Sequence, residues 1–337
     1  MIQRADGSAL YNLASVVDDF DMKITHVIRA AEHLSNTPRQ IFIAQALGYP
    51  LPEYAHVPFV AEPGSKNKLS KRKIADYLKN HEFKKLYDHG ERIAQVLGLP
   101  IAAETFNPVI VDFYEKVGYI PDAIVNYLLL IGWSLDDKTE FCTREEMIRH
   151  FSLERINRAP ASFDAKKLFA FQERYMGQVS VDEKLNMVAP FMQQAGILSS
   201  GENAAELKKL REVVAAASDR IKVAGDVLDY ASFFQPAEKL VYDEAAFEKR
   251  LRAPAEAAGL LRRFGGVLEG LEPFDAATIE QRLQQFVQDE GVGHAQIIHG
   301  LRLAATGKTV GFGLFETLAI LGKAECARRI ELALARI

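Results

Sequence analysis

The chain has 337 residues, 48% of them hydrophobic and 26% charged, and its formal net charge is −4 at pH 7. This length allows two or three domains with buried cores. The mildly acidic balance argues against general, charge-driven nucleic-acid affinity, but it is compatible with a folded RNA held by local basic patches.

The cysteine content and the hydrophobicity of the chain indicate the cellular compartment in which we expect it. Cys142 and Cys326 are the only cysteines, they lie far apart, and neither is near a histidine cluster. We therefore expect no disulfide and no protein-bound zinc, and a reducing cytoplasm as the location. The first residues lack the apolar core of a secretory signal, and no apolar run approaches 18 residues, so we expect a soluble protein that does not span a membrane.

The N-terminal part predicts an extended segment followed by a strand. Residues 9–13 alternate in polarity, and the β-branched residues 24–28 predict a buried strand that ends at Arg29. At the carboxyl end of a strand in an open α/β sheet, Arg29 would face a ligand crevice. Taken alone, an exposed strand-end arginine is the simpler interpretation, and Tyr11 is more simply a half-buried strand tyrosine.

A helix is predicted from Thr37 to about Leu47. Thr37 is a candidate N-cap, Pro38 suits the first helical position, and Gly48 would end the helix. Ala44 and Leu47 would give it an apolar face. Residues 55–60 then predict a short buried strand.

Positive charge concentrates after this strand. Between residues 66 and 92 there are nine Lys or Arg against four Asp or Glu, and Ser70 lies between Lys68 and Lys71. A loop of this kind, made mobile by Pro63-Gly64-Ser65, could close on a polyphosphate and neutralise developing charge. A solvated charged surface is the alternative interpretation.

From residue 121 onward the periodicity is helical. Thr143 with Glu146 predicts a capped helix start, and apolar residues recur at helical spacing in several stretches. These residues are Leu207, Leu210, Val214 and Ala217, then Ile279, Leu283, Phe286 and Val287. Gly307-Lys308-Thr309 is not interpreted as a phosphate-binding loop, because a helix rather than a strand is predicted before it.

Residues 68–72 (Lys-Leu-Ser-Lys-Arg) resemble the second signature loop of class I aminoacyl-tRNA synthetases, in the form found in glutamyl-tRNA synthetases. Residues 11–19, 24–29 and 36–40 resemble the same family in order and spacing. The helical tail is similar to the helical cage of the bacterial-type glutamyl enzymes rather than to the β-barrels of the glutaminyl enzymes. The resemblance implies a partial Rossmann-like α/β catalytic segment followed by a mostly all-α helical anticodon-binding region.

The resemblance also implies an expected domain organisation. Residues 1–73 would form the second half of the catalytic domain, and residues 74–175 a helical stem-contact region with an insertion at about 74–116. Residues 176–236 and 237–337 would be two anticodon-binding helical subdomains. The family's His-Ile-Gly-His type motif is not in the sequence, so we expect a C-terminal portion, cut within the catalytic domain, that alone is poorly active or inactive.

Site roles follow from the resemblance residue by residue. Tyr11 and Arg29 would bind glutamate, and Arg220 would sense the first anticodon base, although an exposed helix-end arginine explains Arg220 equally well. The catalytic loop residues would be Lys68, Ser70, Lys71 and Arg72. The ATP-binding residues would be Glu32, His33, Phe59, Val60 and Lys71.

The implied function is that of a glutamate–tRNA ligase, which forms glutamyl-adenylate from glutamate and ATP and transfers the glutamate to its tRNA. ATP would be a substrate accompanied by Mg²⁺, the tRNA for glutamate would be the partner, and the chain would be a monomer. One alternative is a non-catalytic protein that binds the tRNA anticodon. Another is an interaction module without any RNA role.

Overall fold

The structure is a computed structural model that describes residues 2–136, 138–157, 159–199 and 203–337. It divides into two compact units. Unit 1 comprises Met1–Gly90, Ile101–Glu115 and Tyr119–Tyr175, and unit 2 comprises Glu91–Pro100, Lys116–Gly118 and Met176–Ile337. Within the described residues, no helix is both long enough and apolar enough to cross a bilayer.

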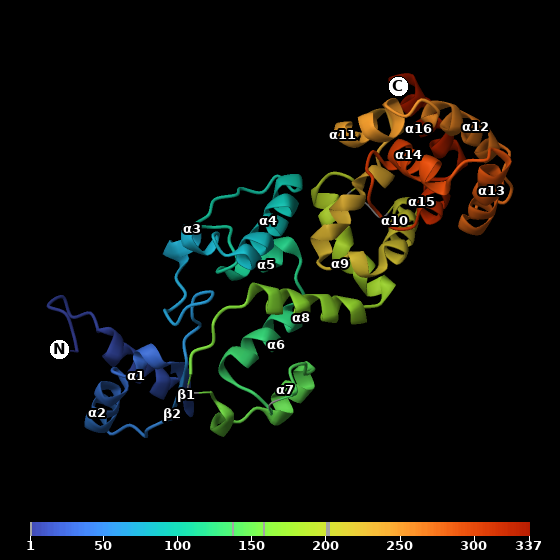
Figure 1. Ribbon diagram of the computed structural model, residues 1–337. Helices are drawn as coiled ribbons and strands as arrows, with labels where there is room; N and C mark the ends of the chain where they lie inside the picture. Colours follow the sequence, from blue (N-terminus) through green and yellow to red (C-terminus); the bar gives the residue numbers. More distant parts are fainter. Residues whose placement is uncertain (1, 137, 158, 200–202) are drawn as a thin grey trace. The chain divides into compact units, whose positions relative to one another are not determined.

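The elements follow one another along the chain as Figure 1 shows. The first part contains α1 (Tyr11–Asp21), β1 (His26–Ala30), α2 (Thr37–Leu47), β2 (Glu53–Val57), α3 (Ile74–Tyr77), α4 (His81–Val96), α5 (Val111–Val117), α6 (Pro121–Gly132), α7 (Arg144–His150) and α8 (Ala165–Gln178). The second part contains α9 (Val181–Gln194), α10 (Ala204–Ala217), the 3₁₀ segment η5 (Ala224–Phe233), α11 (Glu244–Phe247), α12 (Ala257–Glu269), α13 (Ala276–Asp289), α14 (His294–Thr306), α15 (Leu314–Leu321) and α16 (Lys323–Arg336).

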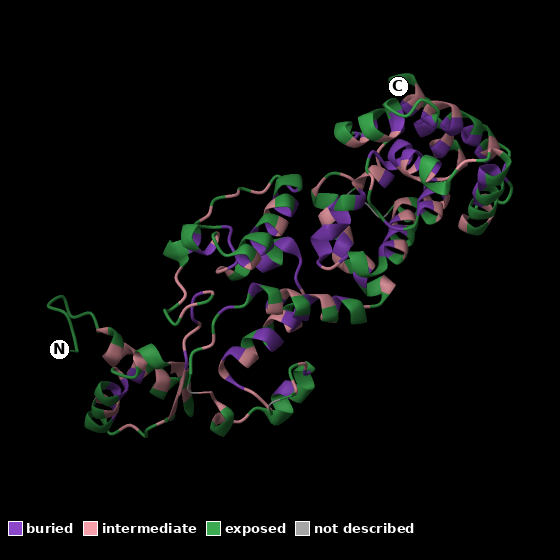
Figure 2. Cartoon of the chain, in the orientation of Figure 1, coloured by how far each residue is buried: buried purple, intermediate pink, exposed green. Residues whose placement is uncertain are grey.

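The sheet of unit 1 is a βαβ arrangement. Strands β1 and β2 are parallel, with α2 between them in the sequence, and their register pairs Arg29 with His56. Both predicted strands are therefore present, shifted by about two residues. They are not buried as expected, since all of their side chains are half-buried or exposed (Figure 2).

The expectation of an extended segment at residues 9–13 is wrong, because α1 begins at Tyr11. Leu13, Val16, Val17 and Phe20 recur at helical spacing, and Val16 is the buried member of this set. Five alternating residues are too short a pattern to outweigh an eleven-residue amphipathic helix.

Helix α2 has the predicted bounds. Gly48 ends it in the left-handed conformation, at φ 72°. The N-cap position is held by Asn36 rather than by Thr37, and the Thr37 hydroxyl is used elsewhere. The predicted apolar face is smaller than expected, because Ala44 is buried but Leu47 is exposed.

The other helix predictions are confirmed. Thr143 and Glu146 form a reciprocal capping box at the start of α7. In unit 2, Leu210 and Val214 of α10 and Ile279 and Leu283 of α13 are all buried. The part of the chain that the structure describes is thus a small parallel α/β segment followed by a mostly helical region, which is the expected fold class.

The loop after α14 begins at Gly307, whose φ is 75°. A Cβ built there would lie 2.1 Å from the carbonyl oxygen of Val241, so only glycine fits. Because a helix precedes this glycine, the Gly307-Lys308-Thr309 stretch is a helix end and not a phosphate-binding loop.

Candidate functional site

The carboxyl end of β1 presents Arg29. Its Nη2 donates a hydrogen bond to Oγ1 of Thr37 at 2.7 Å, and the same hydroxyl lies 2.8 Å from Nε2 of His56. Burial, followed by the charge of Arg29, lowers the pKa of His56, so the imidazole beside the guanidinium is kept neutral. Nε of Arg29 is buried and, among the described residues, has no hydrogen-bond partner. An orphaned guanidinium donor fits a ligand carboxylate.

The side chains of Tyr11 and His33 contact each other near the segment that bears Arg29. The Tyr11 hydroxyl lies 3.4 Å from Nδ1 of His33, and the two ring centroids are 5.9 Å apart. The Tyr11 residue is 52% exposed although it lies on α1. The structure therefore brings together one residue that was predicted to contact glutamate and one predicted to contact ATP.

The basic hairpin reaches the same strand end. Lys68 Nζ donates to Oε2 of Glu32, which lies two residues after β1, and Glu32 also faces His33 at 3.7 Å. The hydrogen bond from Lys68 is the main cause that lowers the pKa of Glu32. The Lys68 ammonium is thus close to the strand that bears Arg29.

The base of the hairpin is fixed by backbone pairing. Ala61 and Lys68 form an antiparallel bridge, and the Leu69 amide donates to the Val60 carbonyl at 2.9 Å. Phe59 and Val60 are half-buried and lead from β2 into this hairpin. They therefore position the loop lysine, whatever further contacts they make.

A buried carboxylate anchors the far side of the hairpin. Glu62 is 8% exposed, accepts a hydrogen bond from Lys73 Nζ at 2.7 Å, and accepts a second from the Tyr77 hydroxyl at 3.2 Å. The Lys73 hydrogen bond lowers the pKa of Glu62, and Glu62 in turn raises the pKa of Lys73. The Ser70 amide donates to the Tyr77 hydroxyl at 2.9 Å, so the anchor extends into the signature loop.

The remaining loop residues face outward. Ser70 caps a short 3₁₀ turn, where its Oγ accepts from the Arg72 amide at 3.4 Å. Lys71 and Arg72 are exposed, and within the described ranges neither has an acidic partner. Two cations beside the Lys68 ammonium are therefore free to meet a polyanion.

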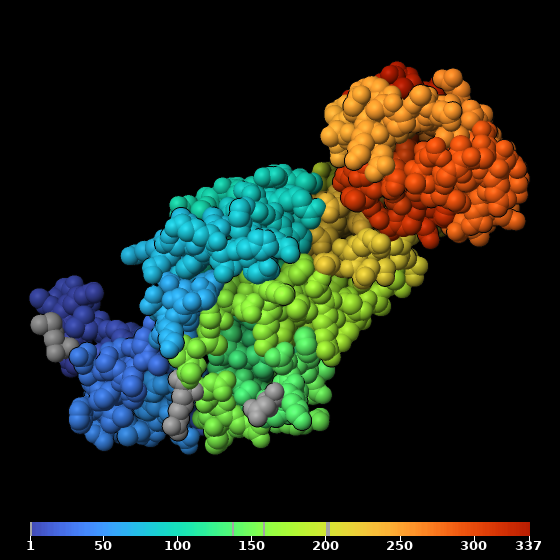
Figure 3. Space-filling view, in the orientation of Figure 1, coloured from blue at the N-terminus to red at the C-terminus, as the bar shows by residue number. Residues whose placement is uncertain are grey.

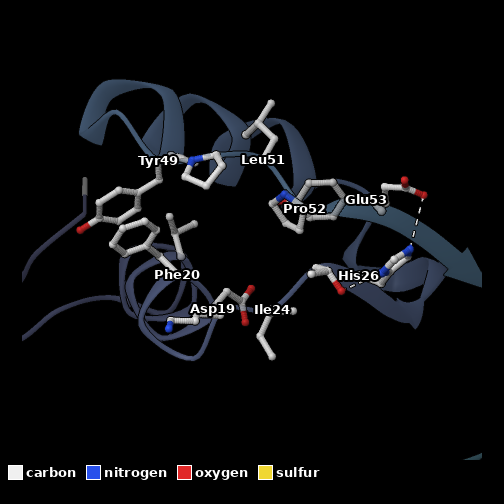
Figure 4. Close-up of a pocket in the computed structure, with 14 residues that line it drawn as sticks. Asp19, Phe20, Ile24, His26, Tyr49, Leu51, Pro52 and Glu53 are labelled. Carbon is white, nitrogen blue, oxygen red and sulfur yellow. Dashed lines mark hydrogen bonds and ion pairs between the residues drawn. The ribbon is translucent and has the colours of Figure 1, made fainter.

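Another cavity of unit 1, of about 440 Å³, is shown in Figure 4. It lies at the amino ends of the strands, where His26 Nε2 is 3.6 Å from Glu53 Oε2 and the Phe20 ring stacks on Tyr49 at 3.7 Å. None of the predicted site residues lines it. Ligands of open α/β sheets bind at the carboxyl ends of the strands, so this cavity is not the candidate site.

Unit 2 holds a separate basic cavity of about 570 Å³, called here the Arg220 cavity. Among the described residues its lining includes the cations Arg92, Arg220, Arg302 and Lys308 and the aromatic residues Tyr230, Phe233 and Phe312. The acidic Asp229 also lines it and pairs with Arg92. The Phe233 and Phe312 rings stack with centroids 5.3 Å apart. Cations interleaved with aromatic faces are suited to unstacked nucleic-acid bases.

Hydrogen bonds to backbone carbonyls position two of these cations. Arg302 Nη1 donates to the carbonyl of Phe312 at 2.8 Å, and Lys308 Nζ donates to the carbonyl of Asp229 at 3.0 Å. Burial lowers the pKa of Arg302. Within the described part of the chain, the ion pair of Arg220 is a long one with Asp219 at 3.8 Å, so its guanidinium keeps donors for a ligand.

Sequence reasoning missed several of these residues. The strand register that places His56 opposite Arg29 could have suggested that histidine, and the Thr37 hydroxyl was assigned to a cap. Glu62 had no sequence signal beyond its place before the basic hairpin. Arg302 and Lys308 come together with Arg220 only through the helical packing of unit 2.

Comparisons with known families define the class of protein. Residues 1–101 and 106–170 match the family described as tRNA synthetases class I (E and Q), catalytic domain, and residues 183–334 match the family described as anticodon binding domain. The chain thus joins catalytic-domain sequence of class I tRNA synthetases to an anticodon binding domain. The first match includes residues 74–101 and 106–116, most of the stretch expected as an insertion.

Over its whole length the chain is homologous to glutamate–tRNA ligases. It is 36% identical over 339 residues to the glutamate–tRNA ligase of Desulforudis audaxviator, covering 100% of this chain and 60% of the relative. The glutamate–tRNA ligase of Moorella thermoacetica is 35% identical to this chain, and the match covers 99% of this chain and 61% of the relative. Among solved structures, the chain is similar to a crystal structure of the glutamate tRNA ligase from Elizabethkingia meningosepticum in complex with its amino acid. The TM-score is 0.74 and the sequence identity 26%, and the match covers 99% of this chain and 61% of that structure's chain. The chain therefore spans about three fifths of these relatives.

Proposed function

We propose that this chain works as part of a bacterial-type glutamate–tRNA ligase, contributing the catalytic lysine loop and the anticodon-binding region. The observation that carries the proposal is the meeting of Lys68 with Glu32 at the carboxyl end of the strand that bears Arg29. The helical character of the described part after residue 121 supports the bacterial type.

The first step would be attack of the glutamate carboxylate on the α-phosphate of ATP, which gives glutamyl-adenylate and pyrophosphate. Arg29, whose Nε has no partner among the described atoms, would hold the amino acid together with Tyr11. Because the nucleophile is already ionised, the main task is to stabilise charge in the transition state. The glutamyl group is then transferred to the terminal ribose of the tRNA.

Lys68 and Lys71 would neutralise the triphosphate. The Lys68 ammonium would exchange its exposed bond to Glu32 for phosphate oxygens, and an exposed ion pair of this kind opposes the exchange weakly. Ser70 and Arg72 would add donors. Glu32, His33, Phe59 and Val60 would border the ATP at the base of the hairpin.

Mg²⁺ would enter with ATP. The described residues contain no group of three or more His, Cys, Asp or Glu side chains that could hold a metal ion. Mg²⁺ keeps its waters and binds readily through substrate phosphates, so ATP itself can supply its ligands. The protein's contribution is the arrangement of cations around the same phosphates.

The Arg220 cavity would receive anticodon bases of the tRNA for glutamate. Its aromatic faces offer stacking and its cations offer hydrogen bonds to base edges.

Cys142 and Cys326 are free and buried, which supports a reducing, cytoplasmic location. The four domain boundaries and the monomeric state stay predictions.

Glutamate-dependent ATP–pyrophosphate exchange tests the proposal. It should be measured for the chain alone and after addition of a polypeptide that supplies the remaining part of a glutamate–tRNA ligase. We expect Lys71→Ala to slow exchange by about 10² to 10³, the loss seen when one transition-state donor is removed. Lys66→Ala, in the same exposed hairpin, is the matched control. Equal exchange in the two variants would refute the role of Lys71.

A non-catalytic tRNA-binding protein is the second candidate, because the Arg220 cavity is built within unit 2. This candidate would be favoured if the supplemented chain catalyses no exchange but binds the tRNA. Arg220→Gln should reduce the preference among transcripts that differ in the first anticodon base. Arg282→Gln, on the exposed face of α13, is the control and should leave that preference unchanged.

A further inference from the structure

A second cavity of unit 2, of about 310 Å³, is formed beside a π-helical turn and is called here the π-turn cavity. The turn, η7, comprises Glu248–Arg252. The lining includes the cations Lys249 and Arg250, and from α14 the polar residues Gln296 and His299. Helices α12 and α14 pack against each other, and Figure 3 shows the adjoining light-orange and orange-red surfaces of this unit.

A close helix contact builds this cavity. A Cβ at Gly300 would lie 2.9 Å from Cδ2 of Leu251, and Leu251 is buried. Glycine at this position therefore lets the π-turn approach α14 closely. π-Helical turns are frequent at functional sites, and this one contributes two consecutive basic residues to the lining of the cavity.

The charge of the cavity favours an anion. Within the described residues neither Lys249 nor Arg250 has an acidic partner, whereas the neighbouring Arg252 is paired with Glu248 at 2.9 Å. Of the described lining residues Glu256 is acidic, and its charge also acts on Arg263, outside the cavity. The first turn of α14 adds the partial positive charge of a helix N-terminus.

Helix α14 connects this cavity with the Arg220 cavity. Gln296 and His299 line the first, and Arg302 and Thr306 line the second. Successive members of this set are three or four residues apart, so the two cavities lie along neighbouring parts of the same helix. From Gln296 to Thr306 the helix rises about 15 Å, a distance that a few nucleotides of an RNA strand can span.

We propose that the π-turn cavity binds a backbone phosphate of the RNA strand whose neighbouring bases enter the Arg220 cavity. Among the described residues the lining has cations but no Phe, Tyr or Trp, which suits a phosphodiester and not a stacked base. The cavity would fix the register of the strand without reading its sequence. This inference rests on the proposed tRNA-binding function.

Salt-dependent binding of tRNA transcripts tests the inference on the full chain. The double variant Lys249→Gln/Arg250→Gln should weaken binding at low salt. The slope of log affinity against log salt should fall by roughly 0.7 to 0.9 for each phosphate that the variant no longer neutralises. The weakening should be the same for transcripts with matched and mismatched anticodons, because phosphate contacts carry no sequence information. Arg220→Gln should instead act mainly on the matched transcript.

The matched control is Arg262→Gln/Arg282→Gln, which removes the same charge from two exposed arginines outside both cavities. The inference is overturned if the slope in the Lys249/Arg250 variant is unchanged or equals that of the control. If Arg220→Gln still has its effect in that case, the proposed tRNA-binding function stands. If the unaltered chain binds no tRNA, both are overturned. Lys249→Gln alone, at an exposed position, repeats the test if the double variant loses helicity by circular dichroism.

Discussion

Replacement of Arg329 tests how the wall of the Arg220 cavity is held. The arginine is 1% exposed. Its Nη1 donates to the Ala305 carbonyl at 2.6 Å, its Nη2 donates to the carbonyls of Ser232 at 2.7 Å and Gln235 at 2.9 Å, and its Nε donates to Glu325 at 2.7 Å. Ser232 itself lines the cavity. One guanidinium thus joins α16 to α14 and to the end of η5.

Arg329→Met keeps an unbranched side chain that replaces the aliphatic part of the arginine, but it removes the guanidinium and with it every donor. Each buried acceptor left without a partner costs about 1 to 3 kcal/mol, and relaxation reduces the sum. Breaking a buried charged pair costs about 3 to 5 kcal/mol, so we expect unit 2 to lose a similar free energy of unfolding. For a domain of roughly 150 to 250 residues, this lowers Tm by about 6 to 20 °C.

Thermal and urea unfolding followed by far-UV circular dichroism measure this loss, and hydrogen exchange locates it in α14 and α16. Arg328→Met is the control, since Arg328 is an exposed neighbour whose ion pairs with Glu238 and Glu331 lie at the surface. tRNA affinity should fall together with stability in Arg329→Met only. A loss below about 1 kcal/mol, the average for any substitution, would refute the reasoning.

Three further predictions concern unit 1. Tyr77→Phe removes the acceptor of the Ser70 amide, so trypsin should cleave after Lys71 faster than in the unaltered chain, and equal rates would contradict the anchor. Because Lys73 lowers the pKa of Glu62, the anchor is complete above about pH 4.3, the ordinary glutamate value, and is lost as pH falls through the lowered pKa. The Ser70 amide resonance should shift in that acidic window, and a shift near neutral pH would count against the assignment. Thr143→Ala removes a capping box and should lower the stability of unit 1 by about 0.5 to 2 kcal/mol, measured by the fluorescence of the buried Trp133; no change would show that the cap is not needed.

The sequence predicted correctly those helices whose first and last residues are set by interactions between neighbouring residues. Helix α2 has the predicted bounds because Pro38 and Gly48 act on their own backbone. The capping box of Thr143 and Glu146 needs only residues three apart. Such interactions require no knowledge of the rest of the fold.

The errors occurred where tertiary packing decides. The exposure of β1 and β2 depends on how many strands and helices cover the sheet, and the β-branched residues of a strand do not carry that information. The Thr37 hydroxyl forms hydrogen bonds with Arg29 and His56, because the strand register places these two residues opposite each other. Its sequence context had suggested a helix cap instead.

The candidate site was predicted in part. The strand pattern placed Arg29 at a strand end, and the resemblance gave the expected roles of Arg29 and Lys68. The structure brings Lys68 next to Glu32, two residues after that strand, and the roles themselves stay predictions. The anchor at Glu62 was not predicted, because its partners Lys73 and Tyr77 are 11 and 15 residues away. Their convergence is a property of the folded hairpin.

The glycine that ends α14 constrains any attempt to engineer base preference. Lys308 and Val310 line the Arg220 cavity and follow Gly307, which no residue with a Cβ can replace without moving the backbone of Val241. A mutant library that varies both lining residues but keeps this glycine should yield folded variants with new selectivity. Randomising all three positions would mostly produce chains with a displaced turn and no usable pocket.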